Sequence, residues 1–446
     1  MQQIDGQTSL KIVQLTPGAG EMYCGNCLRD NAVVAWWNRL GHHVSMVPLY
    51  LPLTLDEPDQ SQDVPVFFGG INVFLDHKIP RIWRFVPKRL RRLLDSRTFL
   101  KTLGRRVSKT NPADVGALTV SMLQGEHGRQ RKELHELSNW MRQEQNPDVI
   151  SFSNALLLGM HHHLQKTIGA KTVCFLTGED TFLDSLPEPY RSQAWSLIKD
   201  RVREIDLLIA PSRFYAELMC ERLELPPQRI HVVYNGINTD GYEDETTTDD
   251  SVMGNRPPVL GFFARMCSSK GLAVLVDAFI EIRKRGNFST LQLKIGGNLN
   301  PWNESWMEIL KLKLQLAGVL QDVSFHPNVS RNEKIHFLRS LDVFSVPVVG
   351  QEPFGFYVVE ALAAGVPVVL PAKSAFPELV EKSGGGVLYP ADDRFALVET
   401  CEQLLADEPK RRHLSTTGRK NALEFFSINR AAQESMELVL GLFESE

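Results

Sequence analysis

The sequence is poor in cysteine, and its cysteines are scattered. Six are spread over 446 residues, and only Cys24 and Cys27 lie close together. This spacing does not provide a disulfide framework and suits a reducing compartment. The two cysteines form a single Cys-x-x-Cys pair without the second ligand pair that zinc requires. We therefore expect them to pack at the start of a helix.

Long apolar runs and an excess of basic charge are also missing. No apolar stretch approaches the ~20 residues that a helix needs to cross a bilayer. The first fifteen residues show no basic segment leading into an apolar one, so we expect no signal peptide. The formal net charge is -4 and the isoelectric point about 6.3, whereas nucleic-acid-binding domains are usually basic. We expect a cytoplasmic protein without a nucleic-acid partner, and attachment to the cytoplasmic face of a membrane stays open.

Short apolar runs alternate with helix-length amphipathic stretches along most of the chain. The runs lack polar alternation, which is typical of strands buried on both faces of a parallel sheet. This alternation predicts an α/β fold with two Rossmann-like domains facing across a cleft. The predicted strands are 11–15, 44–48, 149–152, 172–176, 207–210, 230–233, 259–263, 291–295, 323–325, 343–346 and 366–370.

An acidic stretch divides the chain into two strand-rich halves. Residues 238–258 are rich in Thr and Asp and nearly free of large apolar side chains. A surface loop is one interpretation, but the position of this stretch favours a linker between domains. The predicted domains are 1–240 and 256–425, with a C-terminal helix, 426–446, that packs back on the first domain.

A basic segment interrupts the pattern in the first half. Residues 81–109 carry many Arg and Lys and one acid, Asp95. Leu90, Leu93 and Leu94 share a helical face. The segment is either a helical insertion with a solvated basic face, or a basic amphipathic surface for an anionic membrane or acceptor.

The run 343–370 carries the strongest chemical signal. A strand, a loop and a helix follow one another, with Glu352 before the helix and Glu360 two turns later. Eight residues at ~1.5 Å rise separate the two by about 12 Å, which fits a folded nucleotide sugar with Glu352 at the sugar and Glu360 at the ribose. Between them lies a helix N-terminus, whose free N–H groups suit a diphosphate. Gly355 lets the backbone approach a phosphate closely.

The wider run is similar to a known motif. EPFG at 352–355, followed by VEALAAGVPVV at 359–369, resembles the E-x7-E motif of retaining GT-B glycosyltransferases, the large family 4 in particular. In that family an Arg, a Lys about five residues later and a Gly follow the first strand of the second domain. Arg265, Lys270 and Gly271 match that pattern.

The resemblance implies roles for these and weaker matches. Arg265 and Lys270 would contact the diphosphate and neutralise the leaving group, as cations can where other transferases use a metal ion. No Asp-x-Asp follows a predicted strand, so we expect a reaction without a metal or any other cofactor. The positions that would face the donor are Glu352, Phe354, Gly355, Glu360, Gly296, Asn328 and Val329.

The acceptor side resembles the family less closely. Gly18, Ala19 and Gly20 follow the first strand, where the family has a glycine-rich loop near the donor phosphate and the acceptor. Their spacing is not that of a dinucleotide-binding loop. Many family members have a histidine after the strand 172–176, and Thr177 occupies that place here, before Glu179 and Asp180. Either Thr177 or the acids bind the acceptor, or Asp180 caps the next helix and activity is altered.

These signals predict a retaining, metal-independent glycosyltransferase with a nucleoside-diphosphate sugar as donor. The acceptor is a glycan, a lipid or a small molecule. Because the departing phosphate can take the acceptor proton, the missing histidine does not exclude activity. Two alternatives stay open: a nucleotide-sugar binder without catalysis, and a sugar-nucleotide epimerase on the same fold.

Overall fold

The chain forms two compact units, residues 1–234 with 431–446, and residues 235–430. The computed structural model describes residues 2–4, 7–18, 25–68 without positions 52, 54, 56, 62, 63 and 65, 112–243 and 256–444. The basic segment 81–109 lies outside the described residues, as do Ala19, Gly20 and Cys24. Among the described residues, no helix is long and apolar enough to cross a membrane.

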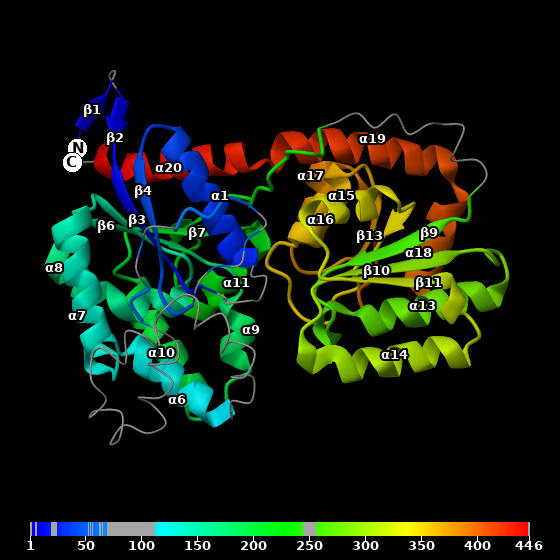
Figure 1. Ribbon diagram of the computed structural model, residues 1–446, viewed down its shortest axis with the longest axis horizontal. Helices are drawn as coiled ribbons and strands as arrows, with labels where there is room; N and C mark the ends of the chain where they lie inside the picture. The colour runs from blue at the N-terminus through cyan, green and yellow to red at the C-terminus, as the bar shows by residue number, and fades with distance from the viewer. Residues whose placement is uncertain are drawn as a thin grey trace. The chain divides into compact units, whose positions relative to one another are not determined.

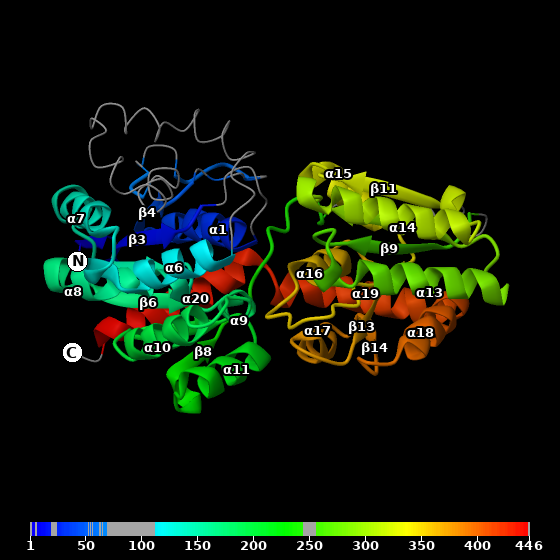
Figure 2. The ribbon, with the colours of Figure 1, turned by 90° about the horizontal axis from the view of Figure 1, so that it is seen from below.

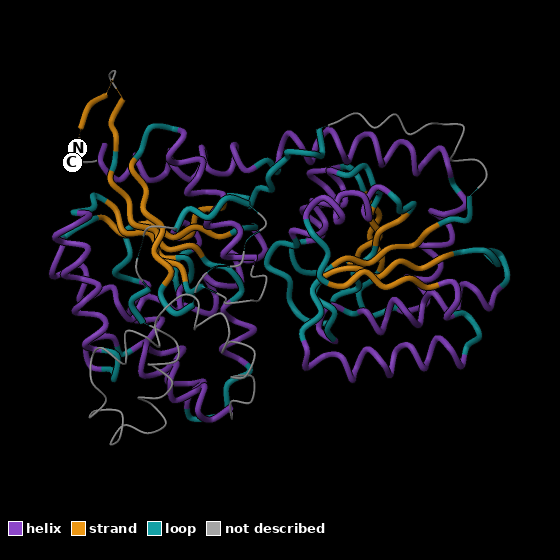
Figure 3. The backbone as a smooth tube through the Cα atoms, in the orientation of Figure 1, coloured by secondary structure: helices purple, strands orange, loops and turns teal. Residues whose placement is uncertain are grey.

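The first unit is built on a six-stranded parallel sheet covered by helices (Figures 1 and 3). Its strands, in spatial order, are β4 (His43–Pro48), β3 (Lys11–Thr16), β5 (Val149–Phe152), β6 (Lys171–Phe175), β7 (Leu207–Ala210) and β8 (Ile230–Val232). Its helices are α1 (Gly25–Arg39), α6 (Pro112–Leu123), α7 (Arg131–Trp140), α8 (His161–Ile168), α9 (Glu179–Asp184), α10 (Tyr190–Val202), α11 (Arg213–Leu223) and α20 (Ile428–Glu444). Every residue of β5 and β7 is buried, as the uninterrupted apolar runs predict.

The second unit has the same construction, with helices on both faces of its sheet (Figures 1 and 2). Its parallel strands, in spatial order, are β11 (Val323–Pro327), β10 (Gln292–Gly297), β9 (Val259–Phe263), β12 (Val343–Phe344), β13 (Val368–Pro371) and β14 (Gly386–Tyr389). Its helices are α13 (Leu272–Arg285), α14 (Glu304–Leu316), α15 (Arg331–Arg339), α16 (Phe356–Ala363), α17 (Phe376–Ser383), α18 (Arg394–Ala406) and α19 (Glu408–Phe425).

The predicted α/β class with two Rossmann-like sheets is confirmed, and the differences are local. Strand β14 was not predicted, because its run begins among three glycines, 384–386, that weaken any strand signal. The short antiparallel hairpin β1 (Gln2–Ile4) and β2 (Gln7–Ser9) was also missed. The strand predicted at 343–346 is only Val343–Phe344, since the chain turns early into the loop that carries Glu352.

The end of the chain belongs to both units in turn. The backbone of Ile237 accepts a hydrogen bond from Ile428 N and donates one to Phe426 O, each of 2.8 Å, so the start of α20 is tied to the second unit. Further along α20, the carbonyl of Ala432 accepts a hydrogen bond of 3.0 Å from the indole of Trp37 in α1. Trp37 is fully buried, and α20 therefore forms part of the first unit's core.

Candidate active site

Two loops of the second unit meet beyond the carboxyl ends of β9 and β12. Gly271 has a φ of +73°, and a Cβ at that position would lie 1.7 Å from the carbonyl oxygen of Pro347. No L-residue with a side chain fits there, because both the backbone angle and the space exclude it. This contact holds the short helical turn Ser268–Lys270 beside the loop that leads to Glu352.

Lys270 and Glu352 form a buried group with a tyrosine from α16. The Lys270 ammonium forms an ion pair with Glu352 Oε2, and the Tyr357 hydroxyl donates a 2.6 Å hydrogen bond to the same oxygen. Lys270 Nζ also lies 5.3 Å from the centre of the Tyr357 ring. Glu352 is only 7% exposed. Burial, together with the Glu352 charge, holds the pKa of Tyr357 well above its usual range, so the phenol stays a donor.

Arg265 lies close enough to influence the same group. It follows β9 and is exposed, and its positive charge opposes the rise in the pKa of Tyr357. Lys270 thus contacts the Glu352 carboxylate directly, and Arg265 acts through its charge on the tyrosine that bonds the same carboxylate. Sequence reasoning selected both cations and Glu352 but missed Tyr357, which carries no sequence signal of its own beyond its place in the motif.

Glu360 is held by a second cation from another helix. Lys334 Nζ in α15 lies 2.6 Å from Glu360 Oε1, and both side chains are mostly buried. Lys334 was not among the predicted residues, because nothing in its local sequence distinguishes it from other helical lysines. Within the described part of the chain only Lys334 is found on this carboxylate, so its other oxygen can accept hydrogen bonds from hydroxyl groups.

The residues between the two glutamates shape the helix start. Gly355 has a φ of +98° and is the residue before α16, and a Cβ there would approach the Phe376 ring to 3.1 Å. Phe354 is 2% exposed and packs against Phe356 and Phe426, with ring centres 5.3 and 6.0 Å away. The side chain of Phe354 therefore anchors the loop, and ligand contact from this residue would have to come from its backbone.

The remaining donor-side predictions lie at the ends of β10 and β11. A Cβ on Gly296 would lie 2.6 Å from the Phe263 ring. Asn328 has a φ of +55°; its N–H donates to Gly297 O at 2.9 Å, and its side-chain oxygen accepts from Leu299 N at 3.0 Å. Val329 follows and is half-buried. The sequence-predicted residues of the second unit thus cluster at one edge of its sheet.

On the first unit, Gly18 follows β3 and Thr177 follows β6, and β5 lies between these two strands. Gly18 has a φ of +76°, and a Cβ there would lie 1.8 Å from the carbonyl oxygen of Leu51. Thr177 Oγ1 accepts a 3.0 Å hydrogen bond from the amide of Asn26, in the first turn of α1. The hydroxyl proton of Thr177 remains available to another acceptor. Asn26 was missed, although it lies inside the Cys-x-x-Cys run.

Glu179 and Asp180 are held together by a tyrosine. The carboxylate of Glu179 accepts backbone hydrogen bonds from Ala155 N, Thr177 N and Gly178 N, of 2.7 to 2.9 Å. The Tyr215 hydroxyl lies 2.9 Å from oxygens of both Glu179 and Asp180. The acids are 3% and 4% exposed. Burial, with these two neighbouring charges, raises the pKa of Tyr215 well above its usual range.

The interpretation of Asp180 as a helix cap does not hold. The residue before α9 is Gly178, with a φ of +113°, and no side chain caps this helix. The side chain of Asp180 forms a hydrogen bond with Tyr215 instead.

The same unit contains a buried ion pair from α1. Arg29 donates to Asp30 and to Ser153 O, and Asp30 accepts a hydrogen bond from Thr16 at 2.7 Å. Adjacent opposite charges in a helix gave no sign that they would be buried.

Comparison with known proteins identifies the family. Residues 244–421 match the model of glycosyl transferases group 1, and residues 113–240 match that of glycosyltransferase family 4, so together the two models cover more than half of the chain. The α-maltose-1-phosphate synthase of Mycolicibacterium smegmatis is 31% identical over 48% of this chain and 57% of its own length. The matches to the first curated relatives span 37% to 59% of their lengths.

Solved structures agree on the fold over nearly the whole chain. A sucrose-phosphate synthase from Thermosynechococcus elongatus superimposes with a TM-score of 0.70 at 16% identity, over 98% of this chain and 99% of its own. The Anabaena protein HepE, solved with UDP and glucose, gives 0.63 at 16% identity, over 97% and 100%. The chain belongs to glycosyltransferase family 4, the glycosyl transferases group 1, and has the GT-B fold.

Proposed function

We propose that the protein is a retaining, metal-independent glycosyltransferase of the cytoplasm. It moves a sugar from a nucleoside-diphosphate sugar to a glycan, a lipid or a small molecule. The observation that carries this proposal is the group formed by Lys270, Glu352 and Tyr357, with Arg265 beside it. Family membership supports the reaction class.

The donor would exchange partners within this group. Lys270 now neutralises Glu352, and a diphosphate would draw the ammonium toward its own charge. Glu352 keeps the hydrogen bond from Tyr357 and can then accept hydrogen bonds from hydroxyl groups of the sugar. Arg265 and Lys270 then stabilise the negative charge that develops on the leaving phosphate. The structure of HepE with UDP and glucose supports a donor of this kind.

Glu360 would hold the other end of the donor. Its partner Lys334 leaves part of the carboxylate free, and vicinal ribose hydroxyls can donate to it. The side chain of Asn328 holds the loop at Leu299 in place. The nucleotide base of the donor would form hydrogen bonds with backbone groups of this loop. In the retaining reaction the acceptor hydroxyl attacks on the face that the phosphate leaves, and the phosphate takes its proton.

The acceptor would bind on the first unit, near Gly18 and the Thr177 hydroxyl. Glu179 and Asp180 are enclosed by hydrogen bonds, so they would shape this region from behind while Thr177 and Asn26 face the acceptor. Two similar proteins are named as synthases of sugar phosphates. Phosphorylated sugars therefore belong in the acceptor screen.

The test is a donor panel followed by product analysis. Purified protein is incubated with UDP-, GDP- and ADP-linked sugars, with and without EDTA, and followed by thermal melting and by release of nucleoside diphosphate. We expect one donor to raise the melting temperature and to be consumed in the presence of EDTA. NMR of the product should show the anomeric configuration of the donor. Inversion would refute the retaining assignment, and loss of turnover in EDTA would refute metal independence.

Two outcomes distinguish the alternatives. Protection by a donor without turnover, over a broad set of acceptors, would favour a nucleotide-sugar binder. Conversion of the donor into its epimer without an acceptor would favour an epimerase. If no donor gives either protection or turnover, the proposed function is wrong.

A further inference from the structure

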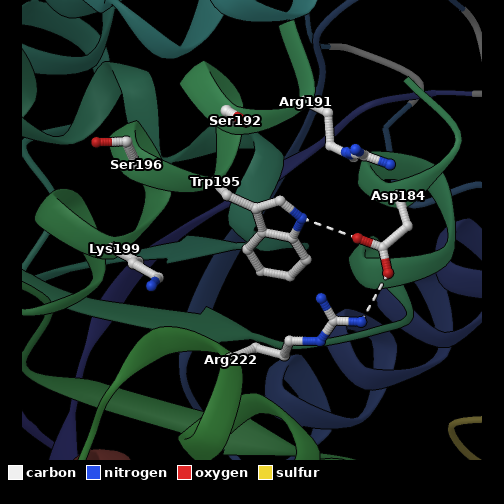
Figure 4. A pocket seen from close by; sticks show the side chains of 7 residues that line it. All are labelled: Asp184, Arg191, Ser192, Trp195, Ser196, Lys199 and Arg222. Carbon is white, nitrogen blue, oxygen red and sulfur yellow. Dashed lines mark hydrogen bonds and ion pairs between the residues drawn. The ribbon is translucent and has the colours of Figure 1, made fainter. Parts of the chain in front are cut away.

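The first unit contains an open hollow that none of the motif residues line. It encloses about 650 Å³ between the end of α9, one face of α10 and the end of α11. Figure 4 shows the residues around it: Asp184, Arg191, Ser192, Trp195, Ser196, Lys199 and Arg222. Three of these side chains are cationic and one is anionic, and each cation is ion-paired: Arg222 with Asp184, Arg191 with Glu188 and Lys199 with Glu224.

The floor of the hollow is an indole ring in a fixed orientation. Trp195 Nε1 donates a 3.0 Å hydrogen bond to Asp184 Oδ1, and Arg222 forms a 2.8 Å ion pair with the other oxygen of Asp184. The Arg222 guanidinium carbon lies 5.5 Å from the centre of the indole. Trp195 is half-buried and packs against the core. In Figure 4 its ring lies in the middle of the hollow, with the polar side chains around it.

The cations at the rim have partners that a ligand can replace. Arg191 pairs with Glu188 at 2.7 Å, and the two side chains are 46% and 48% exposed. Lys199 pairs with Glu224, which is 64% exposed. Because water screens ion pairs of exposed side chains, an anion entering the hollow can exchange with these carboxylates at little cost.

A flat aromatic face with a ring of charged and hydroxyl groups matches the chemistry of a sugar. A pyranose presents an apolar C–H face that can cover an indole, and its edge presents hydroxyls that need hydrogen-bond partners. Ser196 is exposed and can provide such a partner, and Ser192 can do so in exchange for the 2.8 Å hydrogen bond that it donates to Glu188. Arg191 and Lys199, whose exposed carboxylate partners can be displaced, favour a sugar that carries carboxylate, phosphate or sulfate groups.

We propose that this hollow is a binding site for an anionic carbohydrate. A sugar ring covers Trp195, and its acidic substituent lies between Arg191 and Lys199. The site is separate from the donor residues and needs no catalytic step, so the proposal stands whether or not the chain is a transferase. The hollow shares helix α9 with the buried acids Glu179 and Asp180, since Asp180 and Asp184 lie one turn apart.

The test uses the full chain and a hyaluronan tetrasaccharide, an anionic probe of low charge density, with uncharged chitotetraose for comparison. Binding is followed by the indole N–H resonance of Trp195, assigned with a Trp195→Phe variant. We expect saturable movement of this resonance by the hyaluronan probe and affinity at least about tenfold weaker for chitotetraose, which corresponds to the loss of one charge-assisted contact.

The variants separate this site from other basic surfaces of the chain. Arg191→Ala with Lys199→Ala removes the rim cations at exposed positions and should weaken hyaluronan binding at least about tenfold. The matched control is Lys311→Ala, which removes a cation from an exposed ion pair on α14, outside the hollow, and should leave affinity within about twofold.

Three outcomes would overturn the proposal. One is a Trp195 resonance that does not move at saturating hyaluronan. Another is a double variant that binds as the unaltered protein does. The third is inorganic phosphate that moves the resonance and displaces hyaluronan at equal concentration, which would reduce the hollow to a simple anion site.

Discussion

The two units bury their carboxylates in different ways. In the second unit, Glu352 and Glu360 are each paired with a lysine side chain, Lys270 and Lys334. In the first unit, Glu179 is bound by backbone N–H groups and by the hydroxyl of Tyr215. A lysine side chain can turn toward a ligand, whereas a backbone amide is fixed by the fold.

This difference indicates what each group is for. The lysine-paired glutamates can exchange their partners, as binding of the proposed charged donor would require. The first unit's acids are satisfied internally, so they fix the loop around Thr177. We therefore expect changes in the second unit to affect turnover, and changes in the first unit to affect stability first.

The largest effect is expected at Lys270 and Glu352. Lys270→Ala and Glu352→Gln should each lower kcat/KM by more than about 100-fold, because they remove charge stabilisation and orientation in the transition state. The double variant should be little worse than either single variant, since the two groups act as a unit. Steady-state kinetics with the donor found in the panel provides the measurement. Fully additive losses, or unchanged rates, would contradict the shared role.

The next effect is on stability, and it tests the first unit. Tyr215→Phe removes the hydroxyl that bonds both Glu179 and Asp180, and should lower the free energy of unfolding by about 1–3 kcal/mol. Donor affinity should not change, because the donor residues lie in the second unit. Denaturant unfolding and donor titration measure the two quantities.

Tyr389→Phe is the matched control for Tyr215. Tyr389 is a buried tyrosine of the second unit, and no hydrogen bond of its hydroxyl is found within the described part of the chain. Its loss should change stability by less than about 0.5 kcal/mol. If the two substitutions lower the free energy of unfolding by the same amount, the Tyr215 hydroxyl does not stabilise Glu179 and Asp180.

The sequence indicated the residues of the E-x7-E run but not the side chains that pair with the buried acids, for a physical reason. Glu352, Phe354, Gly355 and Glu360 lie within nine residues, in a loop and the helix α16 that follows it, so one short motif contains all four. The partners Lys334 and Tyr215 lie 26 and 36 residues away from their acids, and only the packing of helices brings them together.

The sequence also did not predict which charged side chains of the first unit are buried. Arg29 and Asp30 are 4% and 2% exposed, although charged residues in a helix are usually solvated. Their burial depends on Thr16 and on the backbone of Ser153, which β3 and β5 bring to the same place. The alternation of strands and helices, in contrast, depends on local composition, and it predicted both sheets.

A smaller effect is expected at Thr177. Thr177→Val removes the hydroxyl that Asn26 orients and should lower kcat by about tenfold, if this hydroxyl contacts the acceptor or the sugar. Thr177→Ser keeps the hydroxyl and should retain most of the activity. Donor-dependent thermal protection should be the same in both variants. Equal rates for the valine and serine variants would show that the hydroxyl has no part in the reaction.

The smallest effect is a difference in acid sensitivity between the units. Burial lowers the pKa of His42, His161 and His163 in the first unit, and of His326 in the second. Above pH 7 these rings are neutral in both the folded and unfolded chain. As the pH falls through 6.5, the ordinary pKa of histidine, the unfolded chain takes up protons that the folded chain does not, so stability falls.

Hydrogen exchange measures this difference within one protein. Between pH 7.5 and 5.5, after correction for the intrinsic exchange rate, amides of α8 should lose more protection than those of α13, because α8 carries both His161 and His163. His163→Gln preserves a polar contact for Ser138 and removes one titrating ring, so it should reduce the loss in α8. Equal loss in both helices would mean that the buried histidines do not set the acid sensitivity of the first unit.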